Sequence, residues 1–208
     1  NAFEHGTYYN PAFRSPGGIE QTTGYVSDLI TDKAIKWLDS VAESSEPFML
    51  MYHHKTPHRD WMPGPEELRN WDEERQISEP PTLLRDLSGE LDVRQDARMT
   101  IAEHMTDRDV KLERAKYLDA DQARLWEQAF SAGNRAFRDS AMSEQERVRW
   151  KYQRYIKTYI GSVTSMDRQI GRLLDFLEAE GMAENTLVVY CSHDSTYSEQ
   201  ILRDFERE

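Results

Sequence analysis

The chain has 208 residues, a formal net charge of -12 and 31% charged residues. This length allows one large domain or two small ones. The 11% aromatic content, with five tryptophans, argues against a disordered chain. A strongly acidic chain is repelled by phosphates, so we expect no nucleic-acid partner. No apolar run approaches the roughly 20 residues of a membrane span, and the single cysteine, Cys191, cannot form a disulfide within the chain.

The first third of the sequence alternates between a helix, a strand and a polar loop. Residues 10–18 contain two prolines and two glycines, which predicts a turn-rich loop. The apolar spacing over 25–38 predicts a helix, and the short apolar run 48–52 predicts a buried strand. This order is typical of α/β folds, in which ligands gather beyond the carboxyl ends of strands. The histidine-rich loop 53–61 is therefore the first candidate site.

The middle of the sequence is polar. Residues 72–95 predict an irregular surface excursion, because Pro80 and Pro81 interrupt them. Residues 99–116 and 121–139 predict polar helices.

A long helix and a second strand follow. Ser143 and Glu146 form a capping-box pattern, and apolar residues then recur at three- and four-residue steps to Glu180. Gly181 is a plausible C-cap. Residues 187–191 predict a second buried strand that includes Cys191, and Ser192-His193-Asp194 follows at its carboxyl end.

Two stretches together resemble the type-I sulfatase family. An apolar strand runs into Lys-x-Pro-His, here Lys55-Thr56-Pro57-His58. The long helix carries the pattern Ser-x-Asp-x-x-Ile-Gly-x-Leu-Leu, here Ser165 to Leu174. Gly181, Asn185-Thr186 and a valine-rich run follow in the family's order. The resemblance covers residues 6 to 192, and its nearest likeness is to bacterial enzymes that act on sulfated glycans.

The resemblance implies an alkaline-phosphatase-like fold, a mixed sheet flanked by helices, and here an incomplete one. It implies a partial sulfatase domain over 1–194 and a divergent charged tail over 195–208. Such enzymes hydrolyse sulfate esters of glycans or aryl compounds with a formylglycine nucleophile and a calcium ion, and many are periplasmic or secreted. The formylglycine motif Cys-x-Pro-Ser-Arg does not occur in this sequence, and Cys191 lies in a different context.

The resemblance also assigns roles to individual residues. His58 aligns with the histidine that contacts the sulfate and acts as an acid, and Lys55 is a substrate or sulfate contact. Asp194 is a candidate calcium ligand, displaced by one residue from the family position. Trp61 is the tryptophan expected nearest a substrate. One of His53 and His54 should point inward if the strand alternates.

Three interpretations stay open. The chain is a fragment of a glycan- or aryl-sulfatase, cut from a longer protein, that turns over no substrate alone. Alternatively, the chain is a non-catalytic paralogue that acts as a binding or structural module. The altered sequence Ser192-His193-Asp194-Ser195 favours this interpretation. A metal-dependent phosphoesterase of the same superfamily ranks lowest, because the loop after Tyr52 resembles the sulfatase version.

Overall fold

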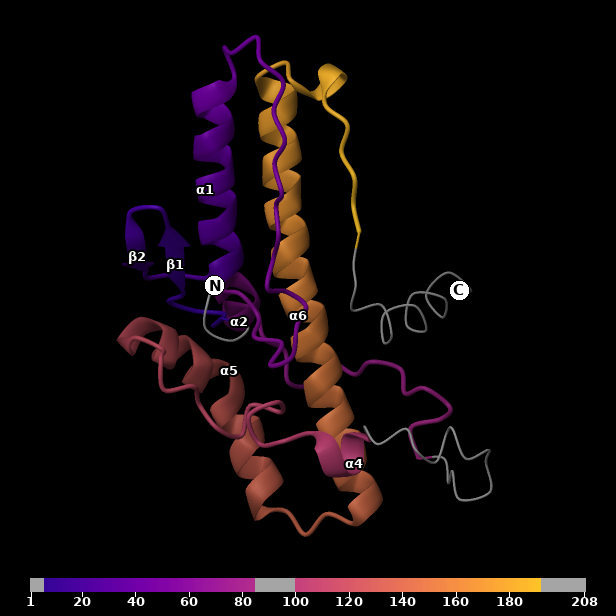
Figure 1. Ribbon diagram of the computed structural model, residues 1–208. Helices are drawn as coiled ribbons and strands as arrows, with labels where there is room; N and C mark the ends of the chain where they lie inside the picture. Colours follow the sequence, from indigo (N-terminus) through magenta and orange to yellow (C-terminus); the bar gives the residue numbers. More distant parts are fainter. Residues whose placement is uncertain (1–5, 85–99, 192–208) are drawn as a thin grey trace.

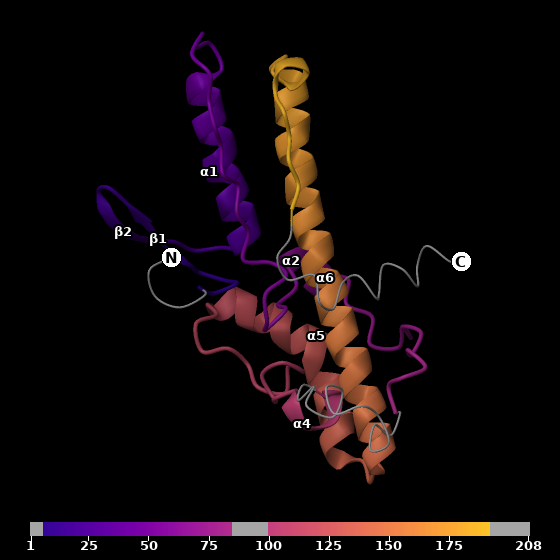
Figure 2. The same cartoon turned by 45° about the vertical axis from the view of Figure 1, so that its right-hand side comes forward.

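The computed structural model describes residues 6–84 and 100–191. Two long helices, α1 (Val26–Val41) and α6 (Glu144–Ala179), run side by side, and α5 (Ala120–Asp139) leads into the opposite end of α6 (Figure 1). The remaining elements are short, namely β1 (Ala12–Ser15), β2 (Gly18–Gln21), α2 (Pro65–Arg69), α4 (Ile101–His104) and the 3-10 helix η1 (Ala183–Asn185). α6 is the central element, because α1, α2, α4 and η1 all pack against it (Figure 2).

The long helix begins and ends where the sequence predicts. The Ser143 hydroxyl accepts a hydrogen bond from the Glu146 amide, and the Glu146 carboxylate accepts one from the Ser143 amide at 2.7 Å. At the other end Gly181 has φ 66°, the left-handed conformation that ends helices. With 36 residues, α6 is about 54 Å long at 1.5 Å per residue.

The two polar helices predicted in the middle of the chain have different outcomes. The prediction for 121–139 is confirmed by α5, which begins with its own capping box between Asp119 and Gln122. The prediction for 99–116 is wrong for most of its described residues. Only Ile101–His104 is helical, and turns follow it. Polar side chains in this region form hydrogen bonds with the nearby backbone. Such hydrogen bonds compete with those of a helix.

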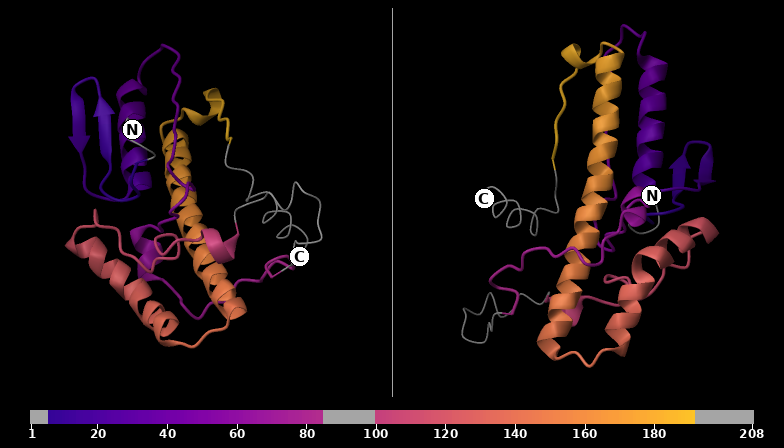
Figure 3. Two further views of the ribbon diagram at one scale, coloured as in Figure 1. Left: turned by 60° about the horizontal axis from the view of Figure 1, so that its bottom comes forward. Right: turned by 180° about the vertical axis from the view of Figure 1, so that it is seen from behind.

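The N-terminal turn-rich region contains a hairpin that the prediction missed. β1 and β2 pair antiparallel, with Ala12 opposite Gln21 and Ser15 opposite Gly18. Gly18 has φ 121°, which a residue with a side chain rarely adopts. The hairpin projects beside the lower end of α1 (Figure 3).

The two predicted buried strands are wrong in the described structure. Residues 48–52 and 187–191 run as extended segments along the helices, and neither belongs to a sheet (Figure 1). The predicted burial is also wrong, since Met49 is 80% exposed, Leu187 is 89% exposed and Cys191 is exposed. A strand needs a hydrogen-bonded neighbour, and among the described residues neither segment has one.

Side-chain alternation still marks 48–52 as strand-like. Phe48, Leu50 and Tyr52 pack against the α1–α6 cluster, while Met49 and Met51 face outward. A period of two is the signature of a strand with one covered face. One face of this segment is covered by helices, and the other is bare.

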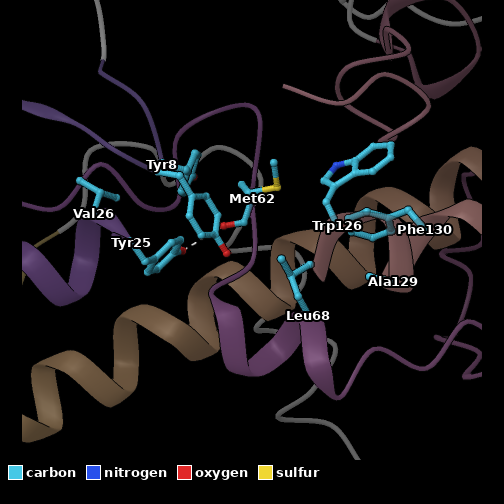
Figure 4. Packing of buried hydrophobic residues seen from close by; sticks show 9 residues of the cluster. Tyr8, Tyr25, Val26, Met62, Leu68, Trp126, Ala129 and Phe130 are labelled. Atoms are coloured by element: carbon cyan, nitrogen blue, oxygen red, sulfur yellow. Dashed lines mark hydrogen bonds between the residues drawn. The ribbon is translucent and has the colours of Figure 1, made fainter. Parts of the chain in front are cut away.

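Three apolar clusters make up the core. One lies between α1 and α6. The second surrounds Trp61 and Tyr155 on the lower half of α6. The third joins the N-terminal tyrosines to α2 and α5 through Met62, Leu68 and Phe130 (Figure 4). Among the described helices, none is long and apolar enough to cross a membrane.

Candidate functional site

The loop 55–64 lies where the segment 48–52 reaches the core, and three tyrosines hold its backbone. The Tyr8 hydroxyl donates to the His58 carbonyl at 2.6 Å. The Tyr25 hydroxyl donates to the Met62 carbonyl at 2.9 Å (Figure 4). The Tyr9 hydroxyl donates to the Pro63 carbonyl at 2.8 Å. Burial raises the pKa of all three tyrosines, so they remain neutral donors at physiological pH.

The end of the loop fits closely against α6. The Gly64 amide donates to the Ser165 hydroxyl at 2.9 Å. A Cβ at Gly64 would lie 2.7 Å from that hydroxyl oxygen, and a Cβ at Gly161 would lie 3.2 Å from Pro63. Both glycines are therefore needed for the loop to approach the helix so closely.

Lys55 is half-buried at the start of the loop. Its ammonium lies 5.0 Å from the centre of the Tyr8 ring, which is a cation–π distance. Burial lowers the pKa of Lys55, while Asp60 raises it and Arg108 lowers it. The Tyr8 ring thus contacts the Lys55 side chain while its hydroxyl bonds the His58 backbone, so one residue supports both candidate groups.

His58 is held through both its backbone and its imidazole ring. Its amide donates to the Lys55 carbonyl at 2.9 Å, and its Nδ1 lies 3.1 Å from the Arg59 carbonyl. A carbonyl can only accept, so this contact assigns the proton to Nδ1. Nε2 is then an acceptor in the neutral ring and a donor in the imidazolium, the form that a general acid requires.

A polar network from residues 104–111 anchors the next part of the loop. The Arg59 guanidinium forms an ion pair with Asp109, with Nε to Oδ1 at 2.8 Å, and also donates to the His104 carbonyl. Burial raises the pKa of Asp109, but hydrogen bonds from Arg59 and Thr106 outweigh it and hold that pKa below its usual value. Asp109 is therefore ionised, and its charge is compensated.

The remaining sequence candidates are divided by the structure. His53 is exposed and His54 is turned inward against Tyr52, which confirms that one of the pair points inward. Burial lowers the pKa of His54 to about 4, so it is neutral. Trp61 is only 9% exposed and packs edge-on against Tyr155, with ring centres 4.7 Å apart. The expectation that Trp61 lies near a substrate is not supported, because its ring belongs to the core.

The expected calcium site is the last candidate. Asp194 lies outside the described residues. Within 6–84 and 100–191, no group of three or more His, Cys, Asp or Glu side chains could hold a metal ion. These residues therefore do not make a calcium site by themselves.

The structure places Lys55 and His58 on the same clamped loop and adds supports that the sequence did not indicate. Tyr8, Asp109 and Lys111 all act on the loop from positions about 50 residues away. No local pattern marks them, since each is an ordinary polar residue in a turn or loop. The only available signal was the unusual number of tyrosines at positions 8, 9 and 25 before the first helix.

Comparisons with known proteins define the class. The sulfatase family model matches residues 3–199. The chain is 35% identical over 205 residues to N-acetylglucosamine-6-O-sulfatase from Bacteroides thetaiotaomicron, covering 91% of this chain and 36% of that protein. It also superposes, with a TM-score of 0.82 and 32% identity, on a solved protein in complex with its substrate D-glucosamine-2-N,6-O-disulfate. That match covers 89% of this chain and 40% of the other.

The chain belongs to the sulfatase family, whose members are sulfuric ester hydrolases. Its fold is part of the alkaline-phosphatase-like α/β fold of that family. The family is generally dependent on formylglycine and a metal ion. The chain spans little more than a third of the relatives it matches. In particular, it is similar to a glycan sulfatase, the N-acetylglucosamine-6-O-sulfatase.

Proposed function

We propose that this chain contributes the sulfate-contacting loop of a glycan sulfatase that acts on 6-O-sulfated glucosamine units. The observation that carries the proposal is the backbone-clamped loop on which Lys55 and His58 both lie, in a chain 35% identical to an N-acetylglucosamine-6-O-sulfatase. Lys55 offsets the charge of the sulfate, and the His58 imidazolium protonates the departing sugar oxygen. A formylglycine nucleophile and a calcium ion would come from sulfatase segments that this sequence does not include.

The bare face of the molecule supports the need for those segments. Apolar side chains of the two extended segments are largely exposed, and they are Met49, Met51, Leu187, Val188, Val189 and Tyr190. Exposed, extended apolar segments are unusual in a soluble monomer. We propose that further strands of the sulfatase sheet cover this face, and that the 208-residue chain alone turns over no sulfate ester.

The test measures binding and turnover separately on the purified chain. We expect N-acetylglucosamine 6-sulfate to shift the NMR signals of His58 and Lys55, and unsulfated N-acetylglucosamine to leave them unchanged. His58→Ala should weaken the affinity read from the Lys55 signals without abolishing it, whereas His53→Ala, at an exposed position five residues earlier, should leave the affinity unchanged. Equal responses to both sugars would refute the sulfate site. Release of sulfate that depends on His58 would refute the inactivity of the isolated chain.

A non-catalytic paralogue remains the second candidate, favoured by the departure from the family pattern at Ser192-His193-Asp194-Ser195. The two candidates differ in what happens after the missing segments are supplied. A chimera that joins this chain to the complementary segments of the Bacteroides relative should hydrolyse the sulfate ester if the loop is catalytic. A folded chimera that binds the sulfated sugar without releasing sulfate would support the paralogue.

A further inference from the structure

A buried lysine ties the His58 loop to the turn at residues 106–112. Lys111 is only 2% exposed. Its Nζ donates to the Asp60 carbonyl, and to the Asp109 carbonyl at 3.0 Å. It also reaches the Arg108 carbonyl at 3.3 Å. An ammonium that donates to carbonyls from two separate chain segments fixes the distance between those segments.

The backbone on both sides of this contact is strained. Asp60 has φ 73° and Lys111 has φ 60°, conformations that residues with side chains seldom adopt. Such conformations persist only where surrounding contacts enforce them, and they gather at functional sites. The Lys111 carbonyl is itself held, because it accepts a hydrogen bond from the Asn134 side-chain Nδ2 at 2.7 Å. Lys111 is thus anchored to α5 while its side chain holds the loop.

Lys111 cannot reach a substrate, because its side chain is enclosed. It acts instead on the segment that carries His58, two residues before Asp60. The adjacent tie between Arg59 and Asp109 holds a side chain, whereas Lys111 holds the main chain. The two contacts restrain different atoms of the same three-residue stretch.

We propose that Lys111 is a positioning residue for His58, with its ammonium fixing the Asp60 carbonyl and hence the orientation of the His58 backbone. This inference rests on the sulfate role proposed above for His58. Lys111→Met keeps a side chain of similar length and removes the ammonium, with its donors and its charge. Lys116→Met is the matched control, because Lys116 is exposed on the same segment.

The first measurement is amide hydrogen exchange on the whole chain, and it needs no ligand. The His58 amide bonds to the Lys55 carbonyl and the Trp61 amide bonds to the His58 carbonyl, so both report on the loop. Lys111→Met should speed their exchange by about tenfold, the effect of losing one charge-assisted hydrogen bond. The α6 amides, as a measure of folding, and the Lys116→Met chain should stay at wild-type rates. Unchanged exchange of both loop amides would overturn the proposal.

The second measurement is a double-mutant cycle on the affinity for N-acetylglucosamine 6-sulfate. If Lys111 acts through His58, Lys111→Met should weaken binding about tenfold in the wild-type chain and have no effect in the His58→Ala chain. Equal weakening in both backgrounds would mean a general structural role and would refute positioning. Absence of binding by the wild-type chain would refute the proposed sulfate site, and amide exchange would then decide the role of Lys111 by itself.

Discussion

Lys111 should give the chain a distinctive dependence of stability on pH. Burial lowers its pKa from 10.5 to about 8, against the raising influence of Asp60 and Asp109, while Arg154 and Arg108 lower it further. The pKa in the folded state therefore lies below that in the unfolded state. Keeping the ammonium in the fold costs stability below pH 8, and this cost fades as the pH rises toward 10.5.

The magnitude follows from the two pKa values. Between pH 7 and pH 9.5, wild type should gain roughly 2 kcal/mol of unfolding free energy relative to Lys111→Met, which has no group to titrate there. Other groups titrate equally in both chains and cancel in the difference. Urea unfolding at the two pH values measures it, with Lys116→Met expected to follow wild type. A wild-type minus Lys111→Met difference that stays constant with pH would show that the buried ammonium has an ordinary pKa, and would refute this reasoning.

Four further substitutions test the helices and the exposed face around the site. Ser143→Ala removes the cap of α6 and should lower the unfolding free energy by about 1 kcal/mol in urea titrations. Gly133→Ala places a Cβ 2.6 Å from Arg154 Nη2 and should cost about 2 kcal/mol, whereas Gly171→Ala, with nothing within 4 Å, should stabilise α6 by a few tenths to about 1 kcal/mol. Met51→Lys, at a position 65% exposed, should raise the concentration at which light scattering appears while changing stability by less than about 0.5 kcal/mol; a larger loss of stability would show that this face is already packed.

The long helices α1, α5 and α6 could be predicted because the information for them is local. The Ser143 capping box, the apolar period after it and Gly181 lie within one continuous stretch, and each is a feature of the backbone geometry itself. The family likewise followed from short motifs around Lys55 and Ser165 whose order could be read directly.

The strands could not be predicted to form in this chain, because a strand depends on a neighbour. The run 48–52 has strand composition and keeps strand alternation, with Tyr52 inward and Met51 outward. Its hydrogen-bonding edges have no sheet partner among the described residues, so pairing is absent although the pattern is present. The composition of a segment is a good guide to the face that it buries. It is a poorer guide to the segment that forms hydrogen bonds with its backbone.

The supports of the candidate site could not be predicted for a similar reason. Tyr8 and Lys111 contact His58 and Asp60 across about 50 residues, and nothing in their sequence neighbourhoods indicates those contacts. Yet the described loop already receives donors from Tyr8, Tyr9, Tyr25 and Lys111. Since the loop takes its shape from contacts within the chain, it should be formed before the missing sheet is added. If the proposed function holds, the remaining sulfatase segments would supply the nucleophile and metal to a loop that is already in place, which would lower the entropy that assembly has to overcome.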